Sequence, residues 1–265
     1  MKFYISADIE GITGVTSWDE TDIDKPAYAI AQKQMTAEVA AACQGALQAG
    51  ASEILVKDAH STGRNILAGD IPHEARLIRS WSGHPFGMVE ELDETFQALA
   101  LIGYHSRAGS GASPLAHTMS GAITYAKIND RFASEFLFAA YTAALVKVPL
   151  VFVSGDQGLC TEINQFHPHI HTLAVKSGIG ESTNSLHPAV AVEQIRAEVT
   201  RALSGDLSRC LIPLPEHFRL ELRYRQHARA YVASFYPGAK QLDDHTILFE
   251  SDSYFEILRY MLFAS

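Results

Sequence analysis

The chain has only three cysteines among its 265 residues, and their positions argue against a metal site built from sulfur. Cys43, Cys160 and Cys210 are far apart, and no Cys-x-x-Cys pair, the usual spacing of thiolate ligands, is present. A small, odd number of cysteines is typical of proteins from reducing compartments. We therefore expect a cytoplasmic protein without a thiolate metal site.

Long apolar runs and an excess of positive charge are missing as well. No uninterrupted apolar run approaches the roughly 18 residues that a membrane-spanning helix needs. No basic and apolar leader precedes the first expected strand, at residues 2–7. The formal net charge of −9 and the pI of about 5.7 argue against a nucleic acid or an anionic membrane as the main partner.

What the chain does contain is enough apolar sequence for one large domain. Hydrophobic residues make up 47% and charged residues 19% of the sequence, as in ordinary globular proteins, and this length can bury a substantial core. The 12 histidines are numerous for this length, and imidazole is a frequent ligand of transition metals. We expect a single domain over residues 1–265, with or without a small accessory lobe.

Short β-rich runs alternate with helical runs along most of the chain. Strands are predicted at residues 2–7, 53–58, 77–78, 96–103, 122–128, 149–155 and 172–175, and helices at residues 26–49, 134–147, 159–166 and 187–203. This alternation, with continuously apolar strands, is typical of a parallel sheet covered on both faces. The predicted fold class is therefore α/β, with a mostly parallel central sheet and helices on both faces.

The pattern changes from about residue 211. Residues 218–223 and 246–250 are predicted to form more exposed strands, and residues 253–263 to form a closing helix. We expect an α/β core over about residues 1–210 and a smaller C-terminal α+β lobe over about residues 211–265.

Two acidic residues directly follow the first predicted strand. Asp8 and Glu10 flank one apolar residue and precede Gly11. Because positions i and i+2 of a strand point the same way, the two carboxylates are expected to project into one cleft. Carboxylates that close repel each other unless a proton or a cation lies between them. Three interpretations are open from this segment alone: a metal site, an acid–base pair, or two solvated residues in a turn.

Two histidines follow later strands in the same way. His60 comes two residues after the strand that ends at Asp58, and His105 follows a long apolar run. Ligands of a parallel α/β sheet gather at the carboxyl ends of its strands, so both imidazoles are expected on the rim that carries Asp8 and Glu10. A lone histidine in such a turn is more often a structural hydrogen-bonding residue, but two on this rim favour a metal site. Asp58 is expected to accept a hydrogen bond from the far nitrogen of a ligand histidine.

Glu135 and His117 are candidates on weaker grounds. Glu135 lies in the first turn of a predicted helix, where a glutamate can simply complement the helix dipole. His117 lies in a Gly-, Ser- and Pro-rich loop over residues 109–120, which is long enough to be functional, although a solvent-exposed histidine would fit there equally.

The residue types in this set indicate which metals would suit it. Carboxylates and imidazoles without thiolates suit Zn²⁺, Mn²⁺ or Fe²⁺, and zinc is the usual choice for hydrolysis. Three carboxylates and two imidazoles exceed the needs of one tetrahedral zinc ion. They suit two metal ions bridged by one carboxylate, an arrangement that activates water and polarises a carbonyl.

Five separate segments of the chain together form a pattern found in one protein family. They are Ser6-Ala7-Asp8-Ile9-Glu10-Gly11, Val56-Lys57-Asp58-Ala59-His60-Ser61, Gly103-Tyr104-His105-Ser106-Arg107-Ala108, His117-Thr118-Met119, and Ile128-Asn129-Asp130-Arg131 with Glu135. In order, spacing and flanking residues they resemble the D-aminopeptidases of peptidase family M55. The likeness covers residues 1 to about 156 and continues more weakly to the C-terminus.

The resemblance implies a dinuclear zinc site, with two Zn²⁺ per chain. Carried over position by position, the zinc ligands are Asp8, Glu10, His60, His105 and Glu135. Asp8 is implied to be the bridging ligand, and the division of the others between the two ions stays open. The implied catalytic residue is His117, either as nucleophile or as general acid–base.

The resemblance also implies an activity and an assembly. Members of the family release N-terminal D-residues such as D-Ala from short peptides, and they form a self-compartmentalising homodecamer of two stacked pentamers. Two alternatives remain: a dinuclear metallohydrolase acting on L-peptides or another small amide, and a non-catalytic metal-dependent peptide-binding protein. Because His117 and all five ligands are present, an enzyme is favoured.

The chain departs from the family pattern in two places. Gln157 follows Gly155-Asp156 where a second aspartate is usual. A Ser-Arg pair that usually follows Val175-Lys176 is replaced around Gly180-Glu181-Ser182. If that arginine met a substrate carboxylate, its loss would alter which peptides fit.

Overall fold

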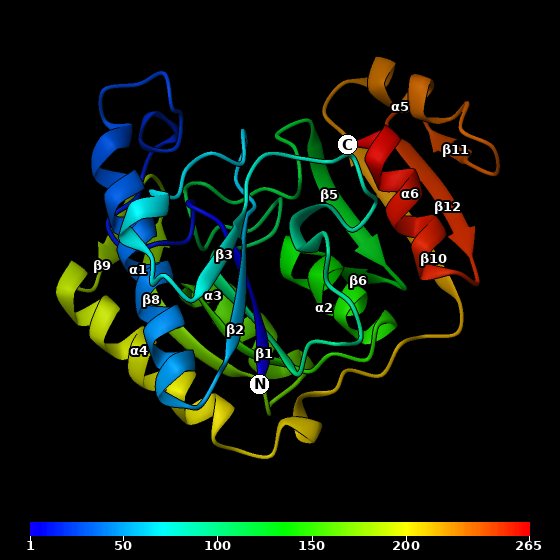
Figure 1. Ribbon diagram of the computed structural model, residues 1–265. Helices are drawn as coiled ribbons and strands as arrows, with labels where there is room; N and C mark the ends of the chain where they lie inside the picture. The colour runs from blue at the N-terminus through cyan, green and yellow to red at the C-terminus, as the bar shows by residue number, and fades with distance from the viewer.

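The computed structural model describes residues 1–265 and contains two β-sheets with helices packed around them (Figure 1). The larger sheet has seven strands in the order β3-β2-β1-β4-β7-β8-β9. Their bounds are β1 Lys2–Ala7, β2 Glu53–Asp58, β3 Ala75–Ile78, β4 Ala98–Tyr104, β7 Leu150–Asp156, β8 His171–Ile179 and β9 Ser182–Ser185. Every neighbouring pair is parallel except β8 and β9, which form an antiparallel hairpin. The predicted, mostly parallel sheet is confirmed.

Helices cover both faces of this sheet. Those on one face are α1 (Tyr28–Gln48) and α4 (Pro188–Leu203), and those on the other are α2 (Glu135–Leu145) and α3 (Gln157–Phe166). Strand β1 shows the reason, because successive residues of a strand face opposite sides. Phe3 and Ile5 pack into the core beneath α1 and α4, whereas Tyr4 packs into the core on the opposite face. The predicted α/β fold class is confirmed.

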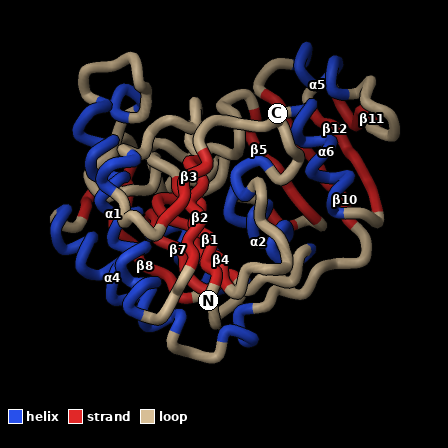
Figure 2. The backbone as a smooth tube through the Cα atoms, viewed as in Figure 1, coloured by secondary structure: helices blue, strands red, loops and turns tan.

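The second sheet is antiparallel, with strands in the order β11-β12-β10-β5-β6 (Figure 2). Its elements are β5 Ile123–Ile128, β6 Arg131–Phe132, β10 Phe218–Tyr224, β11 Lys240–Asp243 and β12 Thr246–Ser251, with helices α5 His227–Ala233 and α6 Tyr254–Ala264. The strand predicted at residues 122–128 therefore lies beside the C-terminal strands and not in the parallel sheet. The C-terminal segment does not build its sheet alone, and the division of the chain near residue 210 stays a prediction.

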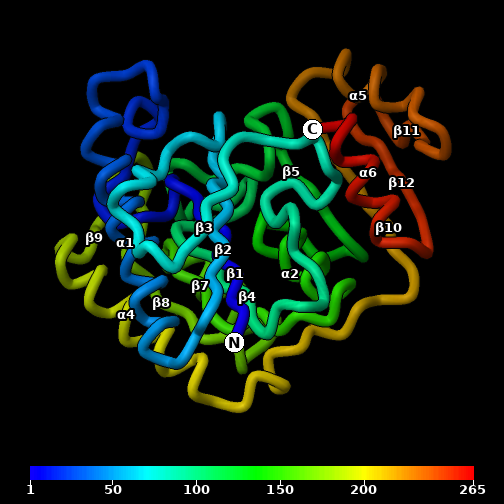
Figure 3. Tube along the Cα trace, in the orientation of Figure 1, coloured from blue at the N-terminus to red at the C-terminus, as the bar shows by residue number.

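The elements that the sequence did not reveal are short or exposed. They are β6, β9, α5 and β11. All four residues of β11 are exposed, and β9 consists of polar residues, so neither shows the apolar alternation that marks a half-buried strand. Residues 211–217 run along the lower edge of the molecule to reach β10 (Figure 3). No helix is both long and apolar enough to cross a membrane.

The parallel strands β1, β2 and β4 bring the predicted site residues to one edge of the sheet. Ala7 pairs with Asp58 of β2 on one side and with Ile102 of β4 on the other. Since the three strands end at the same level, the segments that follow them emerge side by side at their carboxyl ends. Those segments carry the predicted ligands from β1, His60 and His105.

Gly11 lies where the loop after β1 passes closest to β4. Its backbone N–H donates a hydrogen bond of 2.8 Å to the carbonyl oxygen of Gly103. A Cβ atom on Gly11 would lie 1.8 Å from the carbonyl oxygen of Tyr104, and this backbone atom cannot rotate away. The glycine after the acidic pair is therefore required by the close approach of two backbone segments.

Gly11→Ala is expected to destabilise the protein by about 3 kcal/mol or more, because the two backbone segments must separate to admit the methyl group. Thermal unfolding followed by circular dichroism should show a midpoint lowered by roughly 10 °C. Gly111→Ala is the matched control, since nothing lies within 4 Å of a Cβ atom there. Equal midpoints for the two variants would contradict the requirement for glycine.

Candidate metal centre

The structure brings all five predicted ligands together at the carboxyl edge of the parallel sheet. Each side chain is buried, and the set consists of Asp8, Glu10, His60, His105 and Glu135. Asp8 and Glu10 follow β1, His60 follows β2, His105 follows β4, and Glu135 begins α2. Residues separated by up to 127 positions in the sequence thus form one cage.

Asp8 lies at the centre of the cage. Its Oδ1 is 3.3 Å from Nδ1 of His60, and its Oδ2 is 3.4 Å from Nε2 of His105. Each of those nitrogens has a further carboxylate partner, because Nδ1 of His60 is 2.9 Å from Oε2 of Glu10 and Nε2 of His105 is 3.1 Å from Oε2 of Glu135. The cage therefore has two halves that share Asp8.

Two buried polar atoms of the cage are not satisfied by any hydrogen bond. Oε2 of Glu10 and Nε2 of His105 are buried and take part in no hydrogen bond, despite the short distances to their neighbours. Ligand atoms of Asp8, Glu10 and His105 all lie within 4.8 Å of one another. Buried polar atoms without partners are costly, and a cation that they coordinate together would satisfy them. The donor set of carboxylates and imidazoles fits zinc.

The far nitrogens of both histidines are held by backbone carbonyls. Nε2 of His60 lies 2.8 Å from the carbonyl oxygen of Thr21, and Nδ1 of His105 lies 3.0 Å from that of Ser106. A carbonyl oxygen can only accept, so these nitrogens carry the protons. Nδ1 of His60 and Nε2 of His105 are thereby directed into the cage as available ligands.

The expectation that Asp58 holds a ligand histidine was wrong. Its carboxylate accepts hydrogen bonds from the backbone N–H groups of Asn65, at 2.5 Å, and Ile66, at 2.8 Å, and from the side-chain amide of Asn65. These N–H groups lie in the loop after β2 and are closer to Asp58 than either imidazole is. Asp58 therefore shapes the loop that carries His60, and Thr21 supplies the carbonyl instead.

Contacts between carboxylates and imidazoles shift the pKa values of both kinds of group in the cage. Burial alone would raise the pKa of Asp8, but the imidazoles of His105 and His60 hold it far below its usual range. Burial alone would lower the pKa of His60, but the carboxylates of Glu10 and Asp8 outweigh it and raise the pKa to about 11. Burial would raise the pKa of Glu135, yet His105 lowers it to about 2. An incoming cation must therefore displace protons from the imidazoles.

His117 lies against the cage and not free in solvent. Its ring stacks on that of His105, with centroids 4.3 Å apart and planes 9° apart, and its Nε2 lies 3.5 Å from Oε1 of Glu135. Nδ1 of His117 is 2.9 Å from the carbonyl oxygen of Leu115, so Nδ1 carries the proton. The lone pair of Nε2 is then available at the cage for a proton, a substrate carbon or a cation.

Beside the cage lies a pocket of about 620 Å³, whose lining includes Asp8, Glu10, His60 and Glu135. Its walls include both tryptophans of the chain, Trp18 and Trp81, together with Met119. The edge of Trp18 contacts His117, with centroids 5.3 Å apart, and Nε1 of Trp81 donates to the carbonyl oxygen of Ser61 at 2.7 Å. Sequence reasoning missed these wall residues, although two tryptophans in polar loops were a usable signal. No Lys or Arg lines the pocket.

Of the two departures from the family pattern, Gln157 lies at the start of α3 and is not a cage residue. Asp156 caps α3 through the N–H of Leu159 and also accepts hydrogen bonds from the N–H and Oγ of Ser106, directly after His105. Gln157 is exposed at the start of α3 and lies close to Thr161. The aspartate that is kept therefore positions the His105 loop, and the residue that differs does not face the cage.

Two buried residues support the loop after β1 from behind. Nζ of Lys176 donates to the carbonyl oxygens of Glu10 and Val15. Glu38 of α1 accepts a hydrogen bond of 3.0 Å from the backbone N–H of Thr13, while its second oxygen has no partner. Burial raises the pKa of Glu38 from 4.5 to about 7.

Glu38→Gln is expected to stabilise the protein at alkaline pH. A carboxyl whose pKa is raised on folding favours the folded state below its ordinary pKa of 4.5 and loses that advantage as the pH rises through about 7. Above that pH the amide should be more stable than the carboxylate by about 3 kcal/mol, and near pH 5 by less than about 1 kcal/mol. Urea unfolding at both pH values measures this. Equal stability of variant and wild type at pH 8 would contradict the raised pKa of Glu38.

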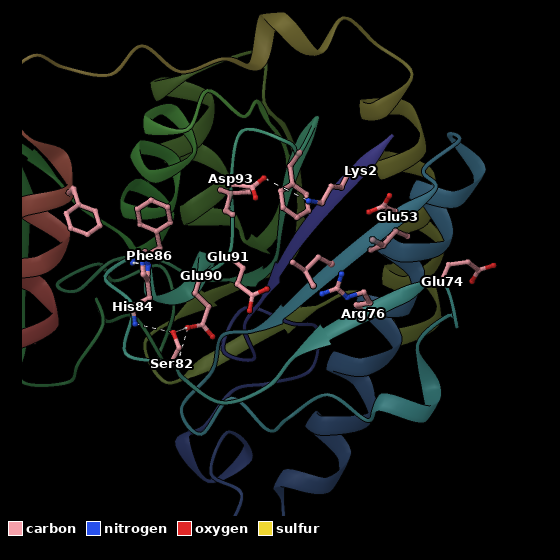
Figure 4. A pocket seen from close by; sticks show the side chains of 15 residues that line it. Lys2, Glu53, Glu74, Arg76, Ser82, His84, Phe86, Glu90, Glu91 and Asp93 are labelled. Carbon is pink, nitrogen blue, oxygen red and sulfur yellow. Dashed lines mark hydrogen bonds and ion pairs between the residues drawn. The ribbon is translucent and has the colours of Figure 1, made fainter.

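A second pocket, of about 570 Å³, has no cage residue in its lining (Figure 4). It includes the residues that begin β1 and β2, Lys2 and Glu53. Two of its acidic groups have partners, since Glu90 accepts hydrogen bonds from Ser82 and Asp93 is paired with Lys2.

Known proteins are similar to this chain in sequence and in fold. A family model described as peptidase M55, D-aminopeptidase, matches residues 1–263. A D-aminopeptidase of Bacillus subtilis (strain 168) is 33% identical over 265 residues, which cover 99% of this chain and 96% of the relative. The solved structure of the Zn-dependent D-aminopeptidase DppA from Bacillus subtilis, described as a self-compartmentalizing protease, superposes with a TM-score of 0.93 at 30% identity. That match covers 100% of this chain and 96% of the solved one.

Proposed function

The chain belongs to peptidase family M55, the D-aminopeptidases, and we propose that it releases N-terminal D-residues such as D-alanine from short peptides at two zinc ions. The proposed ligands are Asp8, Glu10, His60, His105 and Glu135. The observation that carries the proposal is the placement of Asp8, whose two carboxylate oxygens face two different imidazoles at 3.3 and 3.4 Å. A carboxylate in that position suits a bridging ligand.

The geometry supports one division of the ligands. Glu10 and His60 would serve one ion, His105 and Glu135 the other, and Asp8 both. A zinc pair, when bound, supplies polarisation of the scissile carbonyl and a lowered pKa for water. The chain's own contribution is to orient the imidazoles through the carbonyls of Thr21 and Ser106 and to keep the cage buried.

His117 is the proposed catalytic residue. Its protonated Nδ1 is fixed by Leu115, which leaves the lone pair of Nε2 directed at the cage. That nitrogen can accept a proton from the attacking water and return it to the leaving amine, or attack the carbonyl itself. Both roles need the same tautomer. Trp18 and the ring of His105 hold the imidazole from two sides.

The pocket fits a short peptide with a free amino terminus. About 620 Å³ is the size of an ordinary small-ligand site, and the carboxylates of Asp19 and Asp22 at its rim add to the negative charge near the cage. No cationic side chain is present there to pair with a peptide carboxylate. D-selectivity is proposed from the family to which the chain belongs.

We further propose a self-compartmentalising homodecamer of two stacked pentamers, located in the cytoplasm. DppA, which is similar over the whole chain, is described as self-compartmentalizing. An apolar surface on α5, the turn after it and α6 supports assembly, because Tyr231, Val232, Phe235 and Phe263 are each at least 59% exposed. The three cysteines are buried and free, as suits a reducing compartment.

The decisive experiment combines metal analysis with matched substrates. Purified protein should contain about two zinc ions per chain and should hydrolyse D-Ala-Gly-Gly faster than L-Ala-Gly-Gly, with light scattering reporting the mass of the assembly. Faster cleavage of the L-peptide would move the assignment to an L-aminopeptidase with the same metal centre. Zinc binding without turnover of either peptide would point to a peptide-binding protein.

A further inference from the structure

An apolar chamber of about 200 Å³ lies beside the candidate metal centre. Four parts of the chain form its walls: residues 81–89, Met119, helix α2, and the end of α6 with Ser265. Ten of its sixteen lining residues are hydrophobic, and they include Phe138 and Ala139 of α2 and Leu258 and Leu262 of α6. The chamber therefore lies where α2, α6 and the segment 81–89 meet, and Trp81, His84 and Leu262 in its wall are exposed.

The chamber and the pocket over the cage are neighbours with a common wall. Trp81, Met88, Met119 and Glu135 line both. Glu135 is a proposed zinc ligand, so the side chain of one cage residue also forms part of the chamber wall. Ala139 lies one helical turn beyond Glu135 on the same face of α2 and faces the chamber.

Met119 stands between the two spaces in an unusual backbone conformation. Its φ is +62°, a region that residues other than glycine, asparagine and aspartate seldom occupy. Its backbone N–H donates a hydrogen bond of 2.6 Å to Oε1 of Glu135, which holds it there. Non-glycine residues held in such conformations cluster at ligand-binding sites.

The segment 81–89 is fixed on its outer side as well. His84 and Phe86 each lie 6.1 Å, ring centroid to ring centroid, from Phe255 of α6. Figure 4 shows the labelled His84 and Phe86 close to the red helix α6. The wall that Met88 contributes to the chamber is therefore held by packing.

We propose that this chamber receives an apolar side chain of the peptide substrate, from one of the two residues that flank the scissile bond. The proposal rests on the peptidase function proposed above. An apolar cavity of roughly 150 Å³ is large enough for benzene, so this chamber accommodates a leucine or phenylalanine side chain. A charged side chain would lose its hydration against walls that offer few polar partners, and an acidic one would face Glu135. The enzyme is thereby specific for short peptides with a bulky apolar residue at that position.

The test uses two substitutions that place larger side chains in the chamber, one from each of two helices. It then compares the kcat/KM of each variant for several peptides. Leu262→Trp acts from α6, where the native side chain is 44% exposed, and Ala139→Leu acts from α2. Ile30→Trp is the matched control, because Ile30 on α1 is 79% exposed and does not line the chamber. The substrates are D-Ala-Gly-Gly, D-Leu-Gly-Gly and D-Ala-Leu-Gly, with the three L-peptides alongside.

Wild type should cleave one of the two leucine peptides with a higher kcat/KM than D-Ala-Gly-Gly, which identifies the residue that the chamber receives. Both filling variants should lower that leucine-to-alanine ratio by about tenfold or more, and Ile30→Trp should leave it within about twofold. An unchanged ratio in both variants, with unfolding midpoints near that of wild type, would overturn the proposal. So would a change in assembly mass without a change in the ratio, since a second copy would then cover the chamber.

Failure of the proposed function gives a different pattern. If only the L-peptides are cleaved, the D-selectivity fails and the ratio within the L-series still tests the chamber. If no peptide is cleaved, quenching of tryptophan fluorescence by D-Ala-Leu-Gly and D-Leu-Gly-Gly, relative to D-Ala-Gly-Gly, reports occupancy next to Trp81. Equal quenching by all three peptides would contradict the proposed role of the chamber, whether or not the protein is catalytically active.

Discussion

Asp8→Asn should abolish peptide hydrolysis, lowering kcat/KM by about a thousandfold or more. The asparagine keeps the size of the side chain but removes the negative charge between His60 and His105. A shared carboxylate that becomes an amide weakens both halves of the cage at once, and metal ions contribute several kcal/mol to such reactions. Metal analysis by mass spectrometry should show loss of most zinc from the purified variant.

Asp24→Asn serves as the control for Asp8→Asn, because Asp24 is exposed in a loop and does not line the pocket. It should retain the zinc content and kcat/KM of wild type. Circular dichroism of both variants should show the same helix content. Full zinc occupancy and full activity in Asp8→Asn would refute the proposed bridging role of this carboxylate.

His117→Ala should lower kcat by between about a hundredfold and ten thousandfold while zinc content stays the same. The reason is that Nε2 of His117 faces the cage but is proposed to act on the substrate and not to hold an ion. Because the effect falls on the chemical step, KM should change much less than kcat. Steady-state kinetics with D-Ala-Gly-Gly and metal analysis on the same preparation measure both.

His73→Ala is a suitable control for His117→Ala, since the side chain of His73 is 93% exposed. Loss of one zinc ion from His117→Ala would reassign His117 as a ligand, a role for which its position near His105 and Glu135 also qualifies it. Unchanged kcat with full zinc content would exclude His117 from the reaction.

The sequence was sufficient to predict the cage because topology and spacing act together. Carboxyl ends of parallel neighbouring strands meet at one edge, so acids and histidines directly after β1, β2 and β4 had to converge. Glu135 was harder to predict, because the first turn of α2 would accept a glutamate for electrostatic reasons alone. Its proximity to His105 depends on how α2 packs against the sheet, which no local pattern encodes.

Features that depend on loop paths could not be predicted. Because Asp58 and His60 are close in sequence, a hydrogen bond between Asp58 and a ligand histidine was expected. The loop after β2 folds back instead, and its own backbone N–H groups donate to the carboxylate of Asp58. Trp81 reaches the pocket because Lys57 packs over its ring, 4.1 Å from the centroid, and Ser61 accepts its N–H. Such contacts join residues about 20 positions apart through side-chain packing and have no periodic signature.

The antiparallel pairing of β5 with β10 joins two segments that are synthesised far apart in time. Strand β5 precedes Glu135 by a few residues, but its partner β10 leaves the ribosome only after most of the chain has been made. Long-range strand pairs form late, because the intervening chain must first be available. Residues of α2 share one core cluster with residues of β10. We therefore expect the position of Glu135 to become fixed only after β10 has been synthesised.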